Sequence, residues 1–284
     1  GGTANPDVGD AIAAMGDEWW HTVVMPYTDA PNLDTLRNEL LERWGPMKMM
    51  EGIAFAAMRG THGETGTFGH TRNDHLLTVM GTGASPTAPW IWASVNAAIA
   101  AGSLSIDPAR PLQTLRLPGV LAPRLEDRWT LEERNMLLHD GISTYSVDGG
   151  GNVLIERQVT TYRQNAFGSP DPSYLDVNTP ATLGFLRFST RARITQKFPR
   201  HKLASDGTRV APGQAIVTPA DIRNELLALF REHEWAGLVE DFDQYKSELL
   251  VVRNDNDKNR VDVLAPPNLI NQFRIFAMQM QFIL

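Results

Sequence analysis

The chain contains no cysteine among its 284 residues. This absence excludes disulfide frameworks, thiolate zinc sites and cysteine nucleophiles. No uninterrupted apolar run reaches the length of about 20 residues that a spanning helix needs, so we expect no membrane span. Basic residues are not in excess, because the formal net charge is -7. Since phosphate neutralisation by Lys and Arg drives nucleic-acid affinity, we expect no direct nucleic-acid partner.

The first residues, GGTANPDVGDAIAAM, show neither an initiator methionine nor the pattern of a signal peptide. We therefore expect this end to be a cut inside a longer chain. The remaining composition is that of a globular protein, with 42% hydrophobic and 21% charged residues. The length allows one large domain or two ordinary ones, each with its own core.

Residues 1–122 alternate between strand-like and helix-like segments. Three short apolar runs have the composition of buried strands, at 21–27, 52–60 and 75–81. Helical spacing of apolar residues follows at 29–46 and 89–102. Because strands that alternate with helices favour a largely parallel sheet, we expect a layered α/β domain here.

Residues 123–284 mix a hairpin, helices and late strands, so we expect an α+β domain. Thr130 and Glu133 have the spacing of a capping box, which predicts a short helix. DGGG at 148–151 predicts a tight turn between two strands, since glycine supplies positive φ angles. Longer helices are predicted after Thr179 and Thr218, each of which precedes a proline.

The C-terminal sequence FRIFAMQMQFIL alternates in the manner of a strand. An apolar terminal strand at a sheet edge would expose unpaired backbone groups, which favours pairing with another chain. We therefore expect this strand to be buried in its own sheet or in that of a neighbouring molecule. The candidate residues for an intersubunit strand are Phe273, Ile275, Phe276, Met278, Met280, Phe282 and Leu284.

Histidines gather in THGETGTFGHTRNDH, where His62, His70 and His75 lie near Glu64 and Asp74. This pattern matches no known spacing of metal ligands, so a solvated, glycine-rich loop is favoured over a metal or catalytic cluster. The glycines of this segment and of GTGASP do not complete a dinucleotide-binding fingerprint, and we expect no cofactor.

Ser85 lies between a predicted strand and a predicted helix, where a nucleophile could stand. It is not part of a G-x-S-x-G elbow, and the sequence places no base beside it. A serine near the N-terminus of a helix is more often a cap, which is the interpretation we favour.

Two charge runs of opposite sign lie in the second half. Residues 187–209 carry seven basic residues against one acidic residue, and residues 225–248 carry seven acidic residues against two basic ones. Such runs can be two solvated helix faces, or they can meet across copies of the molecule and fix their orientation. Contacts between unlike patches propagate into rings or helices. The interface candidates are Arg191, Arg193, Lys197, Arg200, Lys202, Glu232, Glu234, Glu240, Asp241 and Asp243.

Several phrases taken in order resemble the contractile tail sheath proteins of myophages, in particular those of Mu-like phages. They are DEWWHTVVMPYTDAPNL, SPTAPWIWASVNAAIAA, DGISTYSVDGGGNVLIERQVTTY, DVNTPATLGFLRFSTRARITQKF and the apolar C-terminal strand. The resemblance covers nearly the whole chain. Family members are longer at the N-terminus, where an extended arm precedes the matched region, so the chain resembles the C-terminal part.

The resemblance implies a structural protein of the virion tail without catalytic residues, metal or cofactor, assembled in the host cytoplasm. Its subunits would form hexameric rings, stack around the tail tube protein and contract, with the baseplate and the tail terminator as further partners. It also implies a sheath core domain whose C-terminal strand and hairpin form a sheet across subunits. The alternatives are the sheath of a phage-tail-like bacteriocin or secretion particle, and a small-molecule α/β enzyme that uses the loop from His62 to Ser85.

Overall fold

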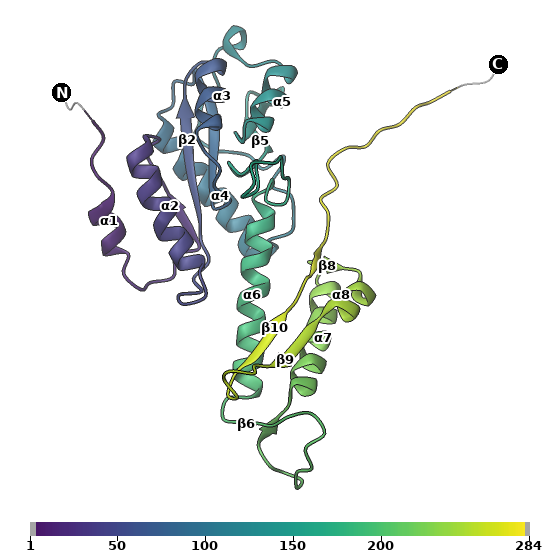
Figure 1. Ribbon diagram of the computed structural model, residues 1–284. Helices are drawn as coiled ribbons and strands as arrows, with labels where there is room; N and C mark the ends of the chain where they lie inside the picture. The colour runs from purple at the N-terminus through teal and green to yellow at the C-terminus, as the bar shows by residue number, and fades with distance from the viewer. Residues whose placement is uncertain (1–3, 282–284) are drawn as a thin grey trace. The chain divides into compact units, whose positions relative to one another are not determined.

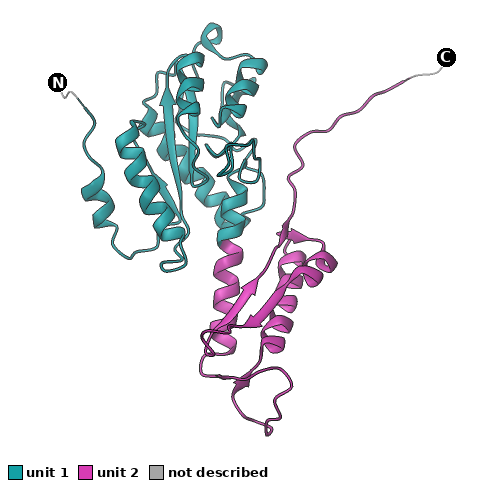
Figure 2. Cartoon of the chain, viewed as in Figure 1, with its two compact units in different colours: residues 1–184 teal, residues 185–284 magenta. Residues whose placement is uncertain are grey.

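A computed structural model describes residues 4–281 (Figure 1). The chain divides into two compact units, residues 1–184 and 185–284, with the division inside helix α6 (Asn178–Lys197) (Figure 2). The expected domains were 1–122 and 123–284. The compact units divide the chain later because the hairpin and the capping-box helix α5 (Leu131–His139) pack with the first unit.

Unit 1 is built on a parallel sheet with the order β1-β2-β3. The strands are β1 (Thr22–Val24), β2 (Ile53–Arg59) and β3 (Leu77–Gly83), so the predicted parallel strands are confirmed. The helices are α1 (Gly9–Ala14), α2 (Ala30–Trp44), α3 (His62–His70) and α4 (Pro89–Ile106), and a 3-10 helix spans Leu125–Asp127.

The two faces of the sheet are covered by different helices, as the alternation of β2 dictates. Ile53, Phe55 and Ala57 share a buried cluster with Trp92 and other residues of α4. Ala54 and Ala56 belong to a second buried cluster with the leucines of α2. Every side chain of β2 from Ile53 to Ala57 is therefore buried.

The predicted hairpin is present as the antiparallel strands β4 (Thr144–Val147) and β5 (Val153–Arg157). Asp148 accepts hydrogen bonds from the backbone N–H groups of Gly150 and Asn152, and Gly151 has a φ of 79°. The hairpin is a separate two-stranded sheet, and an isolated bridge just before β4 links it to β3, where the Ser143 N–H donates to the Val79 carbonyl over 2.9 Å.

Unit 2 contains the C-terminal part of α6, α7 (Pro219–Trp235) and α8 (Phe242–Glu248). Its short strands pair in twos: β6 (Lys202–Leu203) with β7 (Ile216–Val217), β8 (Val239–Glu240) with β11 (Asn268–Leu269), and β9 (Leu250–Arg253) with β10 (Val261–Leu264). The predicted capping box at Thr130 is present and begins α5, and the helix predicted after Thr218 begins with a capping box of Thr218 and Asp221.

Candidate assembly surfaces

The segment after β11 is apolar and exposed. Residues 270–281 lie in no helix or strand of the single chain, and Figure 1 traces them as an extended segment. Phe273, Ile275, Phe276, Met278 and Met280 are all exposed, each by 61% or more. The predicted terminal strand thus has no pairing partner within residues 4–281, and pairing with another molecule stays a prediction. Phe282 and Leu284 lie outside the described residues.

The start of this segment is fixed to unit 2. Asn268 and Leu269 pair antiparallel with Glu240 and Val239, and the Ile270 N–H donates to the Leu238 carbonyl over 3.2 Å. The Asn271 side chain also donates to Glu240 over 3.2 Å. The backbone is therefore hydrogen-bonded up to Ile270, and the Asn271 side chain adds one further contact. The five strongly exposed apolar residues from Phe273 to Met280 come after this point.

The β9–β10 hairpin carries an exposed apolar face. Leu250 lies opposite Leu264, and Val252 lies opposite Asp262. Leu250, Val252 and Leu264 are exposed, while β9 also packs against α7. In a two-stranded sheet each strand has one outer edge, so among the described residues this hairpin offers backbone groups for a further strand.

The two charge runs meet within unit 2. Glu225 of α7 accepts from Arg193 of α6 over 2.9 Å and also pairs with Lys197. Arg193 pairs with Glu232 as well. Opposite charges across these helices lower the pKa of the Glu225 carboxyl, chiefly through the Lys197 hydrogen bond. Part of the predicted interface candidates therefore make contacts inside one chain, an arrangement that neither sequence interpretation anticipated.

The other charged candidates lie apart from this cluster. Glu234 pairs with Arg231 over 2.7 Å, and Lys202 donates to Gln214 over 3.0 Å. Asp241 caps α8 by accepting from the Gln244 N–H. The remaining candidates are Arg191 and Glu240, which are half-buried, and Arg200 and Asp243, which are exposed. Their role between subunits stays a prediction.

Burial of His233 of α7 predicts that the stability of unit 2 depends on pH. Its side chain is buried with Nε2 2.9 Å from the Ser189 hydroxyl, and burial lowers its pKa below the ordinary value of 6.5. Glu232 opposes this shift in pKa and Arg193 adds to it. Because the unfolded state then binds protons more readily, the stability from neutral His233 is complete above about pH 6.5 and is lost as pH falls.

We expect the His233→Gln variant to lose part of the decrease in unfolding temperature that the wild-type protein shows below pH 6.5. Unfolding followed by circular dichroism between about pH 5 and 8, the range over which histidine titrates, measures this. His201→Gln, which changes an exposed histidine of the same unit, serves as the control. Equal pH dependence in the wild-type protein and both variants would contradict the assignment. Some dependence should remain, since burial also lowers the pKa of His75 in unit 1.

The glycine-rich loop expected over residues 61–75 is wrong for most of its length, because His62–His70 form helix α3. Thr61 and Glu64 make a full capping box at its start. Gly66 and Gly69 face Asp140, and a Cβ atom at Gly69 would lie 2.2 Å from the Asp140 carbonyl oxygen. The glycines thus permit close approach between α3 and the end of α5 instead of making a flexible loop.

The three histidines of this region have separate surroundings. The Nε2 of His62 lies 3.0 Å from the Glu133 carbonyl, and that of His70 lies 2.9 Å from the Asp140 carboxylate. His75 packs against Tyr174, with ring centroids 4.7 Å apart. Within residues 4–281, no group of three acidic or histidine side chains is placed to hold a metal ion.

Ser85 is a buried structural residue. Its hydroxyl donates to the Leu121 carbonyl over 2.6 Å and accepts from the Trp92 indole over 2.8 Å. The expectation that Ser85 caps the helix is wrong, because Ala88 is the N-cap of α4. With no exposure to solvent, Ser85 is not presented to a substrate.

Ligands of open α/β sheets usually bind beyond the carboxyl ends of the strands. At this end of β3, a Cβ atom added to Gly81 would lie 2.9 Å from the Trp129 ring. The ring of His62 makes an edge contact with the same indole, with centroids 6.2 Å apart. Trp129 therefore fills the space beside Gly81 and Gly83 near the end of β3.

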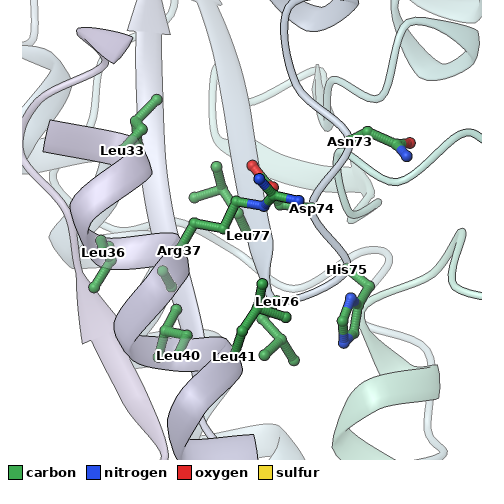
Figure 3. A pocket seen from close by; sticks show the side chains of 11 residues that line it. Leu33, Leu36, Arg37, Leu40, Leu41, Asn73, Asp74, His75, Leu76 and Leu77 are labelled. Carbon is green, nitrogen blue, oxygen red and sulfur yellow. The ribbon is translucent and has the colours of Figure 1, made fainter. Parts of the chain in front are cut away.

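A small pocket lies between α2 and the residues that precede β3 (Figure 3). Leucines of both segments line it, and Arg37 reaches across to Asp74, with Nε 2.6 Å from Oδ1. Its volume is about 40 Å³. That is room for a few water molecules but far less than the several hundred Å³ of a typical small-molecule site.

No helix within residues 4–281 is both long and apolar enough to cross a membrane.

Comparison with solved structures shows a shared fold. The sheath tail protein of Listeria innocua superposes with a TM-score of 0.64 at 13% identity, over 95% of this chain and 62% of that one. The contracted helical sheath of the anti-feeding prophage superposes with a TM-score of 0.64 at 10% identity, over 98% of this chain and 76% of that one.

Sequence comparison gives a relative of higher identity. The Mu-like prophage FluMu tail sheath protein of Haemophilus influenzae is 56% identical over 283 residues. This match covers the whole chain but only 58% of the relative, so the chain spans little more than half the length of that protein. Residues 1–161 match the family model of the phage tail sheath protein central domain, and residues 169–283 match that of the phage tail sheath C-terminal domain. The match to this relative and the matches to the two family models show that the chain belongs to the phage tail sheath protein family.

Proposed function

We propose that this protein is a subunit of a contractile tail sheath. Copies would form hexameric rings that stack around the tail tube protein, between the baseplate and the tail terminator. Contraction of this sleeve would drive the tube through the host cell envelope. The subunit would assemble in the host cytoplasm, reside in the virion tail and act without catalysis. The observation that carries the proposal is the exposed apolar segment 270–281 in a chain that belongs to a sheath family.

In this proposal a layered α/β domain is followed by an α+β core domain, and the C-terminal strand of the core is shared between subunits. An extended segment that joins a sheet edge satisfies its backbone groups through main-chain hydrogen bonds, and alternate side chains set the register. The β9–β10 hairpin is the acceptor that fits best, because its apolar face is exposed. The hairpin β4–β5 fits less well, since Tyr145, Val153 and Ile155 are buried in the core of unit 1.

A shared strand also suits a lattice that changes shape. Hinge motion lets rigid units rotate while a few residues between them absorb the change in backbone angles. The residues after Asn271 are the natural place for this change, because the chain is held up to that point. The energy for contraction would then be stored in the extended lattice.

A related function is the sheath of a phage-tail-like particle that is not a phage. The similarity in fold to the sheath of the anti-feeding prophage supports this alternative. The same subunit contacts would serve in both kinds of particle.

The test uses the full-length protein and electron microscopy of negatively stained samples. Replacing Phe276, Met278 and Met280 together by serine should abolish sheath tubes, since the apolar side chains that would bury in the neighbour are lost. Replacing Gln279 and Gln281 by serine in the same segment is the matched control and should leave tubes intact. Tubes formed by the triple variant at the wild-type concentration would contradict the proposal.

A further inference from the structure

Unit 1 presents one phenylalanine on the tip of a tight turn. Residues 162–171, named here the Phe167 turn, connect the region after β5 with the residues before α6. The side chain of Phe167 is 93% exposed. An exposed apolar side chain alone needs no explanation, because folded proteins show many of them. The turn that carries this ring is, in addition, held in one conformation by hydrogen bonds at its tip and at its base.

The backbone of the tip is fixed by Asn165. Its side-chain oxygen accepts from the N–H groups of Phe167 over 2.9 Å and of Ser169 over 3.1 Å. Its backbone N–H donates to the Ser169 carbonyl, and its carbonyl accepts from the Gly168 N–H, each over 3.0 Å. Gly168 has a φ of 78°, which closes the turn. The residue that carries the exposed ring is thus held from both sides.

The base of the turn is fixed by groups distant in sequence. The side chain of Asn73 accepts from the N–H groups of Arg163 over 2.7 Å and Gln164 over 3.0 Å, and donates to the Gln164 carbonyl over 2.8 Å. The Tyr162 hydroxyl donates to Asp171 over 2.6 Å. The turn is therefore ordered in the single subunit, before any partner binds.

We propose that Phe167 is a preorganised anchor that inserts into an apolar surface of an adjacent copy of this chain in the assembled sheath. This inference rests on the proposed function. Aromatic residues that enter a partner's pocket dominate interface energies, and an anchor held in its bound conformation loses little entropy on binding. Residues 162–168 also fall between the two regions that match the family models, so the anchor is a feature beyond what those models describe.

The test compares variants of the full-length protein in a sedimentation assay of tube assembly. We expect Phe167→Ser to raise the threshold concentration for assembly by about tenfold or more, while the unfolding temperature of the unassembled subunit stays at the wild-type value. Ala166→Ser changes the neighbouring exposed residue and should leave the threshold unchanged. Asn165→Ala keeps the ring but removes two hydrogen bonds of the turn, and should give an intermediate threshold.

A second measurement locates the partner. Replacing Phe167 by the photoreactive residue p-benzoylphenylalanine should give cross-linked dimers of the chain in assembled tubes and none in the unassembled subunit. Assembly of Phe167→Ser at the wild-type threshold would overturn the inference and leave the proposed function standing. Cross-links to a different protein only would overturn the choice of partner. A wild-type protein that never forms tubes would overturn the proposed function, and this inference with it.

Discussion

Asp74→Ala is expected to lower the free energy of unfolding by about 3–5 kcal/mol, the range found when one partner of a buried ion pair is removed. Asp74 and Arg72 are both buried, with side-chain exposures of 7% and 6%. Asp74 accepts from Nε of Arg72 over 2.9 Å and from Nη2 over 2.7 Å. It also pairs with Arg37 over 2.6 Å. Without the carboxylate, a buried guanidinium would lose its main counter-charge just before β3 begins.

The matched control is Asp34→Ala. Asp34 pairs with Nη1 of the same Arg72 over 2.7 Å, but its side chain is 57% exposed. Exposed ion pairs contribute about 1 kcal/mol or less, so this variant should remain close to the wild-type protein. Denaturant unfolding of both variants measures the difference. Similar losses for Asp34→Ala and Asp74→Ala would show that burial of the pair does not determine the effect.

Gly69→Ala is expected to destabilise the protein by about 3 kcal/mol, the upper part of the usual range for overpacking. The added Cβ atom would lie 2.2 Å from the Asp140 carbonyl oxygen and 3.1 Å from a side-chain carbon of Ile142. The closest of these atoms belongs to the backbone, so the clash cannot be relieved by a change of rotamer. Helix α3 would have to move away from the end of α5, and their contact would weaken.

Gly63→Ala in the same helix is the control, and we expect its effect on stability to be neutral or opposite to that of Gly69→Ala. A Cβ atom at this position meets no atom within 4 Å. Alanine is favoured over glycine in a helix interior by about 1 kcal/mol, so this variant should be as stable as the wild-type protein or more so. Thermal unfolding of the two variants measures both effects. A loss of stability in both would show that glycine serves the backbone of α3 and not the contact with Asp140.

The elements that the sequence predicted correctly are those whose determinants are local. The signals are the capping box at Thr130, the Thr-Pro pair at Thr218 and the glycine turn after Asp148, and each lies within a few residues of the structure that it starts. The parallel strands were predictable for a similar reason, since a run of buried residues such as Ile53–Ala57 shows in the composition of the segment itself.

The prediction for α3 failed because its glycines are required by a contact with Asp140, a residue distant in sequence. Glycine has a low helix propensity, so glycines at 63, 66 and 69 were interpreted as a loop. Two of them face Asp140, about seventy residues later in the chain, where a larger side chain would clash. A local signal was present nonetheless, because Thr61 and Glu64 have the spacing of a capping box.

The candidate surfaces were predicted in part. The sequence shows that most of residues 273–280 are apolar, and the structure adds that Phe273, Ile275, Phe276, Met278 and Met280 are exposed in the single chain. Their pairing with a neighbouring subunit stays a prediction. The charge runs were interpreted either as two solvated faces or as patches that meet across copies, because Arg193 and Glu225 are far apart in sequence. In the structure, α6 and α7 bring the two side chains within 2.9 Å of each other in one chain. The Phe167 turn was not predicted, since its order depends on Asn73, a residue of another part of unit 1.

The pairing of β11 with β8 limits the geometry of any lattice built through the C-terminal segment. Residues 270–281 leave unit 2 at a fixed point, and a fully extended stretch of this length reaches about 40 Å at most. Some of that reach is used up by the residues that pair with the neighbour. Under the proposed function, pairing by residues 273–280 would keep the exit point of one subunit within this reach of the acceptor edge of the next, in both the extended and the contracted sheath. The length of this segment would thus set an upper limit on how far neighbouring subunits move apart during a change in sheath length.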